Sequence, residues 1–102
     1  MNYTKKRKVC VVGAGKWGMN HIKTLKKLNA LSGIVEKNDE LVDYLKTNYP
    51  DCLIFKDLDH AVKHNFDGFI IATPPSKHYK NAKLILESGY HLLVEKPITL
   101  NK

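Results

Sequence analysis

Arginine is nearly absent from this chain of 102 residues, although the chain is strongly basic. Of its 17 basic residues only Arg7 is an arginine, and the formal net charge is +7. Proteins recognise base edges and phosphates chiefly with the planar guanidinium group, which forms two parallel hydrogen bonds. The lysines are also spread over several predicted helices rather than gathered on one. We therefore expect a solvated basic surface and no nucleic-acid partner, and a basic nucleic-acid binder is the least favoured alternative.

Cysteines and long apolar runs are equally scarce. The two cysteines, Cys10 and Cys52, are too few for a disulfide framework, and both lie where small core residues fit. His60 and His64 have helical spacing, but no further ligand pair lies near them, so we expect no metal. No apolar run approaches the roughly 20 residues of a membrane helix. The charged N-terminus also lacks the apolar core of a signal peptide. These absences predict a cytoplasmic protein with no membrane partner.

Five short apolar segments alternate with amphipathic segments along the chain. The predicted strands are 8–12, 31–36, 52–55, 68–72 and 91–95. The segments between them carry apolar residues at helical spacing, and the connections are short. This alternation is typical of a parallel sheet with helices on both faces. The sequence therefore predicts an α/β fold, a doubly wound Rossmann-type sheet of about five strands, in one domain over residues 1–102.

Polar residues that can cap a helix precede the last three helical segments. These residues are Asn38 or Asp39, Asp57 and Ser76. The last of the helices is expected to end at Gly89, because glycine adopts the left-handed conformation that closes a helix. Its inward-facing residues are predicted to be Tyr79, Ala82, Ile85 and Leu86.

The first predicted strand runs into three glycines spaced G-x-G-x-x-G, at Gly13, Gly15 and Gly18. Such glycines permit a tight turn, let a pyrophosphate approach the backbone and let the next helix pack closely on the strand. The second strand ends on Glu36, which follows Gly18 by 18 residues. This interval is close to the roughly 20 residues expected for an acid that binds the adenosine ribose. Together these features predict a dinucleotide site.

Ligands of a Rossmann sheet bind beyond the carboxyl ends of the strands, where the strand order reverses. The residues that this rule places around one crevice are Gly13, Gly15, Lys16, Trp17, Glu36, Thr73, Pro74 and Lys96. The charge of Glu36 favours NAD, because it repels a 2′-phosphate, while the adjacent Lys37 offers a cation that softens this preference. Trp17 either covers the cofactor phosphates or anchors its helix on the sheet. His78 either faces the crevice or lies on the surface.

Three segments mark the ends of the first, fourth and fifth strands. They are Gly13-Ala14-Gly15-Lys16-Trp17-Gly18, Ala72-Thr73-Pro74-Pro75-Ser76-Lys77-His78 and Glu95-Lys96-Pro97. Taken together, they resemble the glucose-fructose oxidoreductase / inositol dehydrogenase / MocA family over essentially the whole chain. Residues 15–21 are also similar to the branch of this family that acts on UDP-N-acetylglucosamine and related nucleotide sugars.

The resemblance implies a role for each matching position. Lys96 matches the family lysine that sits beside the nicotinamide, bonds the reacting hydroxyl and assists proton transfer, so it is the predicted catalytic residue. Pro97 matches a proline that shapes this turn, and Glu95 is expected to orient it. Thr73 and Pro74 match the loop that lies along the cofactor.

The resemblance thus predicts the NAD(P)-binding domain of an oxidoreductase that takes hydride from a secondary hydroxyl of a sugar, cyclitol or nucleotide sugar. The family's second domain, which supplies an acid-base residue and the sugar contacts, has no counterpart in this sequence. The chain also stops where Thr99 could cap another helix, so we expect it to be part of a longer protein. The resemblance implies that this longer protein forms homo-oligomers. The chain alone is expected to bind cofactor without turnover. A free-standing NAD(H)-binding or regulatory module is the alternative.

Overall fold

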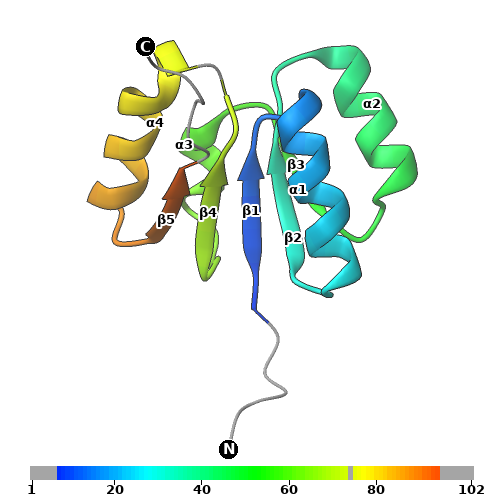
Figure 1. The fold of residues 1–102 in the computed structure, drawn as a ribbon, viewed down its shortest axis with the longest axis horizontal. Coiled ribbons are helices and arrows are strands. Elements are labelled where there is room, and N and C mark those ends of the chain that lie inside the picture. Colours follow the sequence, from blue (N-terminus) through cyan, green and yellow to red (C-terminus); the bar gives the residue numbers. More distant parts are fainter. Residues whose placement is uncertain (1–6, 74, 95–102) are drawn as a thin grey trace, which may run out of the picture.

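The computed structural model describes residues 7–73 and 75–94, in which strands and helices alternate (Figure 1). In chain order the elements are β1 (Val9–Val12), α1 (Lys16–Lys27), β2 (Leu31–Val35), α2 (Asp39–Asn48), β3 (Leu53–Phe55), α3 (Leu58–Ala61), β4 (Gly68–Ile71), α4 (Pro75–Glu87) and β5 (His91–Val94). Within these residues the five strands form one parallel sheet in the order β3-β2-β1-β4-β5. The predicted doubly wound Rossmann-type fold is therefore confirmed.

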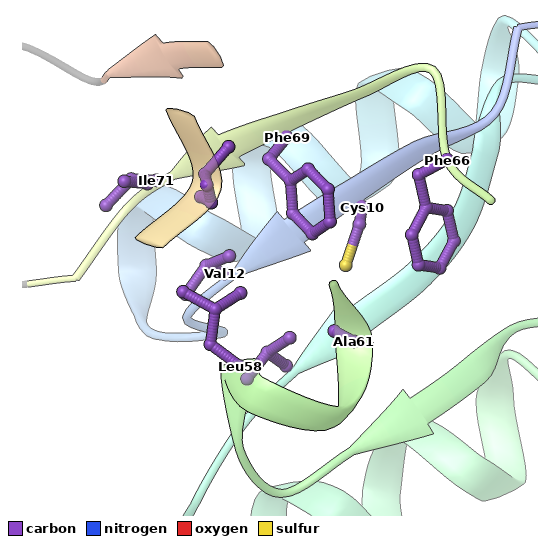
Figure 2. Close-up of a cluster of buried hydrophobic side chains, with 9 residues drawn as sticks. Cys10, Val12, Leu58, Ala61, Phe66, Phe69 and Ile71 are labelled. Carbon is purple, nitrogen blue, oxygen red and sulfur yellow. The ribbon is translucent and has the colours of Figure 1, made fainter. Parts of the chain in front are cut away.

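The middle of the sheet is buried on both faces, as its near-continuous apolar strands predict. On one face, Cys10 and Val12 of β1 pack with residues of α3 and α4 (Figure 2). This cluster contains Cys10, Val12, Val35, Leu58, Ala61, Phe66, Phe69, Ile71 and Ile85. On the other face, Val11 of β1 packs against Ile22 of α1 and Leu45 of α2. Burial raises the pKa of the Cys10 thiol, which therefore serves as a small core residue, as predicted.

The predicted caps hold for two of the three helices. The Asn38 side chain accepts the backbone N–H of Leu41 at 3.0 Å, and Asp57 accepts that of His60 at 3.0 Å. The prediction that Ser76 caps the last helix is wrong, because α4 already begins at Pro75. Proline suits the first position of a helix, where its missing N–H would have no partner within the helix.

The predicted inward face of α4 is correct only in part. Ile85 is buried and Ala82 is half-buried, but Tyr79 is 78% exposed and Leu86 is 58% exposed. The helix packs on β4 and β5, and β5 is the last strand at this edge of the described sheet. No further element in the described part of the chain covers the outer flank of α4, which leaves Tyr79 and Leu86 exposed (Figure 1).

Helix α4 ends as the sequence predicts. Gly89 has a positive φ of +88°, and the N–H of Tyr90 reaches back to the carbonyl of Ile85 at 3.2 Å. Among residues 7–73 and 75–94, none of the helices has the length and apolar character needed to cross a membrane.

Candidate dinucleotide-binding site

The turn after β1 requires glycine at its first position. Gly13 has a φ of +100°, and its N–H donates to the carbonyl of Val35 at 2.8 Å, which ties the turn to the end of β2. A Cβ at this position would lie 3.0 Å from Cγ2 of Thr73 and 3.2 Å from the carbonyl group of Ala72. The turn therefore lies directly against the residues that follow β4, and both the conformation and the space favour glycine.

The other two glycines of the motif serve opposite purposes. A Cβ on Gly18 would lie 1.8 Å from the carbonyl oxygen of Gly13, so α1 packs on the turn at a distance that only glycine permits. A Cβ on Gly15 would meet no heavy atom of the surrounding described residues within 4 Å. Gly15 precedes α1 without a side-chain cap, and the first turn of α1 contains no acidic residue. The start of α1 thus combines open space with backbone N–H groups that can hold a phosphate.

Glu36 joins the turn to the end of β2. One oxygen of its carboxylate accepts the N–H of Ala14 at 2.7 Å, and the other accepts the N–H of Asn38 at 2.9 Å. Each carboxylate oxygen has a second lone pair, so the group can accept two further hydrogen bonds. The predicted ribose acid is therefore hydrogen-bonded directly to the glycine turn, and its carboxylate can still accept hydrogen bonds from a ligand.

Two residues of α4 hold Thr73 at the end of β4. His78 Nε2 donates to the backbone carbonyl of Thr73 at 2.5 Å, which assigns the proton to that nitrogen. The side-chain amide of Asn81 donates to the Thr73 hydroxyl at 3.2 Å. His78 is half-buried, so its contact within the fold is with this loop. Sequence reasoning missed Asn81, because nothing in the pattern of α4 distinguishes it from other polar residues.

Lys16 and Trp17 form the exposed start of α1, beside the glycine turn. The Trp17 side chain is 53% exposed and belongs to neither core cluster. The alternative that Trp17 anchors the helix on the sheet is therefore wrong. Its place beside the phosphate-binding turn leaves it available to a bound cofactor.

Charged side chains surround Glu36 on the side of β3. Lys56, which follows β3, forms an ion pair with Asp39 at the start of α2. The pKa of the Asp57 carboxyl lies below its ordinary value, chiefly because it accepts the backbone N–H of His60. The His60 side chain and the charge of Lys37 lower this pKa further. Sequence reasoning missed the pair of Lys56 and Asp39, whose members belong to different segments.

Four of the predicted site residues lie outside the described residues: Pro74, Glu95, Lys96 and Pro97. Their neighbours in the chain are described. Val94, at the end of β5, pairs in register with Ile71, at the end of β4. The two strands therefore end at the same edge of the sheet as the glycine turn.

The fold and this arrangement of backbone and carboxylate define a nucleotide-binding domain of the Rossmann type. Residues 7–102 match the sequence pattern of a protein family that is described as "oxidoreductase family, NAD-binding Rossmann fold". The chain belongs to this glucose-fructose oxidoreductase / inositol dehydrogenase / MocA family, as the sequence motifs predict. It is therefore the NAD-binding domain of an oxidoreductase family.

Individual relatives agree with this assignment. A UDP-N-acetylglucosamine 3-dehydrogenase of Acidithiobacillus ferrooxidans is 31% identical over 91 residues, which are 89% of this chain and 28% of that protein. The structure of apo scyllo-inositol dehydrogenase from Lactobacillus casei has a TM-score of 0.83 and 27% identity, over 95% of this chain and 30% of its own.

A third relative carries ligands. The WlbA dehydrogenase from Bordetella pertussis, in complex with NADH and UDP-GlcNAcA, has a TM-score of 0.83 and 25% identity, over 93% of this chain and 29% of its own. The chain thus spans less than a third of the length of these relatives.

Proposed function

We propose that this chain binds NAD for an oxidoreductase that takes hydride from a secondary hydroxyl of a sugar, a cyclitol or a nucleotide sugar. One observation carries the proposal: the carboxylate of Glu36 accepts the N–H of Ala14 at 2.7 Å, inside the glycine turn. This bond fixes the ribose acceptor relative to the phosphate-binding backbone. Both parts of a dinucleotide can then be held by one rigid unit, since the diphosphate and the adenosine ribose are covalently joined.

The residues of the turn suit the diphosphate group. The open space at Gly15 admits phosphate oxygens, and the helix α1 directs its first N–H groups toward them. Lys16 supplies a positive charge at the same place, and the exposed indole of Trp17 can cover the group from solvent. The resemblance supports a cofactor-contacting role for Thr73 and Pro74, which match the family loop that lies along the cofactor.

Glu36 supports NAD in preference to NADP. A carboxylate accepts hydrogen bonds from the ribose 2′-hydroxyl and repels a 2′-phosphate, which carries about −1.5 to −2 charges at neutral pH. Two of its lone pairs already bind backbone N–H groups, which holds the carboxylate in the orientation needed for the ribose. The adjacent Lys37 is exposed and offers a cation, which softens this preference.

Lys96 is the residue that we propose to act on the substrate. It follows Val94, the last residue of β5, by two positions in the sequence. The family resemblance gives Lys96 this role, and it implies that Glu95 orients the turn and that Pro97 shapes it. A bound nicotinamide accepts a hydride from the substrate carbon. A lysine beside the reacting hydroxyl would bond its oxygen and help to remove the proton.

The chain alone is proposed to bind cofactor without turnover, as part of a longer protein with a separate substrate domain. Hydride transfer requires a closed site with the substrate in place, and this chain matches 28% of the length of its dehydrogenase relative. An inositol or a nucleotide sugar is the proposed substrate class, since the relatives include dehydrogenases named for both. The cytoplasmic location and the homo-oligomeric assembly stay predictions.

Titration of NADH fluorescence against the 102-residue chain tests the proposal. We expect saturable binding that Glu36→Gln weakens about tenfold, because the ribose loses a charged acceptor worth about 1.4 kcal/mol. Glu40→Gln is the matched control: it removes the same charge from the exposed first turn of α2, and we expect no change. No saturable signal at millimolar NADH would refute the proposed function.

A further inference from the structure

The net charge at the ends of β2 and β3 is opposite in sign to the net charge of the whole chain. This edge carries four carboxylates and two ammonium groups: Glu36, Asp39, Glu40, Asp57, Lys37 and Lys56. The whole chain has a formal net charge of +7. A cofactor that approaches the carboxyl edge near α2 therefore meets more carboxylates than ammonium groups, although the protein as a whole is basic.

The two lysines of this edge lie beside Glu36 in the fold. The N–H of Glu36 donates to the carbonyl of Phe55 at 2.9 Å, so Lys56 follows directly beside the ribose acid. A carboxylate oxygen of Glu36 accepts the N–H of Asn38 at 2.9 Å, which holds Asp39, the next residue, near Glu36 as well. A long lysine side chain at position 56 could thus reach a phosphate on the ribose.

Asp39 engages that lysine. Its carboxylate pairs with the ammonium group of Lys56, although both side chains are largely exposed, at 78% and 61%. The Lys56 ammonium group is therefore held at the start of α2, where Asp39 is also favoured by the helix dipole.

We propose that Asp39 is a specificity-determining residue, which disfavours NADP by holding Lys56 in an ion pair beside Glu36. This inference rests on the proposed function of the site. A 2′-phosphate needs a cation to offset the desolvation of its charge. At this edge it would meet the negative charge of Glu36 and the ammonium group of Lys56, which is already paired with Asp39. The selectivity for NAD thus depends on two carboxylates. Glu36 repels the 2′-phosphate, and Asp39 pairs with the Lys56 ammonium group that would otherwise bind it.

The test measures the ratio of the dissociation constants for NADPH and NADH, by nicotinamide fluorescence at low ionic strength. We expect Asp39→Asn to lower this ratio about threefold, because exposed ion pairs are worth about 0.2–1 kcal/mol. The effect should be larger in a Glu36→Gln background. There the freed Lys56 can attract the 2′-phosphate without opposition from the negative charge of Glu36. Asparagine also suits the start of a helix, so circular dichroism should show α2 intact.

Two controls separate the ion pair from a simple loss of negative charge. Glu40→Gln removes a charge from the same turn, where Glu40 makes no ion pair within the described residues, and we expect a smaller shift in the ratio. In a Lys56→Met background the effect of Asp39→Asn should shrink to that of Glu40→Gln. Methionine keeps most of the length of this unbranched side chain and removes its charge.

The outcomes distinguish this inference from the proposed function. An equal shift for Asp39→Asn and Glu40→Gln, or a shift that survives Lys56→Met, would overturn the role of Asp39 while NADH binding stands. Failure of the unaltered chain to bind NADH would overturn the proposed function and this inference with it. Raised salt should reduce the effect of Asp39→Asn, since exposed charges are screened over about 10 Å at 0.1 M.

Discussion

Two loops meet at the carboxyl edge of the sheet, and they are built in opposite ways. The loop after β1 is shaped by side chains that are missing: Gly13 lies against Thr73, and Gly18 lies against the carbonyl of Gly13. The loop after β4 is shaped by side chains that are present, because His78 and Asn81 of α4 hold Thr73 by its carbonyl and its hydroxyl.

This difference has a physical consequence. Main-chain atoms cannot rotate out of the way as side chains can, so an added Cβ at Gly13 or Gly18 would collide with its neighbours. The glycine loop should therefore tolerate almost no added atom at these two positions. A hydrogen bond between two partly buried side chains contributes about 0.5–1.5 kcal/mol, so the second loop should loosen gradually. At Gly13 and Gly18 the first loop is expected to respond to substitution through folding, whereas the second loop should show small changes in both stability and cofactor affinity.

Gly18→Ala should have the largest effect. The new Cβ would lie 1.8 Å from the carbonyl oxygen of Gly13. Both atoms are bonded directly to the main chain, so neither can rotate away from the other. We expect a loss of about 3 kcal/mol or more in the free energy of unfolding, since α1 must shift away from the turn. Urea denaturation followed by circular dichroism measures this loss.

Lys23→Ala on the exposed side of the same helix is the control, and it should change the free energy of unfolding by less than about 0.5 kcal/mol. A Gly18→Ala chain with unchanged stability would show that the contact between α1 and the turn is not as close as described.

Gly13→Ala should come next, because it strains the junction between the two loops. Alanine at a φ of +100° costs about 1–2 kcal/mol, and its Cβ would lie 3.0 Å from Cγ2 of Thr73. Thr73→Ser removes that methyl group and should restore part of the stability of Gly13→Ala. Thermal unfolding of the two single variants and the double variant measures this coupling. Strict additivity would contradict a direct contact between the loops.

The same contrast explains what the sequence could predict. The glycine turn and the acid Glu36 were predicted, because glycine spacing and the interval to the next strand are local features of the chain. Asn81 was missed, since its partner Thr73 is recognised only when α4 is folded back along β4. The exposure of Tyr79 was also missed, because helical spacing identifies an apolar stripe and not the place where the sheet ends.

Gly15→Ala sharpens the comparison within the glycine loop itself. Within residues 7–73 and 75–94 the new Cβ would meet no neighbouring heavy atom closer than 4 Å, so the free energy of unfolding should change by less than about 1 kcal/mol. The methyl group would occupy the space proposed for the phosphates, and we expect NADH to bind about tenfold more weakly, a loss of about 1.4 kcal/mol. NADH titration beside urea denaturation separates the two effects. An unchanged dissociation constant would place the diphosphate elsewhere.

Asn81→Ala should have the smallest effect, and it tests the second loop. The substitution removes the donor to the Thr73 hydroxyl, which should cost about 1 kcal/mol of stability. Because Thr73 is then held only through its carbonyl, we expect NADH to bind about threefold more weakly, as a loop that is less fixed must be ordered on binding. Lys80→Ala, an exposed change on the same helix, should alter neither value.

A double-mutant cycle with Thr73→Val identifies the bond responsible. Valine keeps the shape of threonine and removes the hydroxyl, so either single variant breaks the same hydrogen bond to Asn81. The stability losses of Asn81→Ala and Thr73→Val should therefore not add in the double variant, since the second substitution has no bond left to break. If the losses add fully, Asn81 stabilises α4 by another route, and the loop after β4 is held by His78 alone of these two residues.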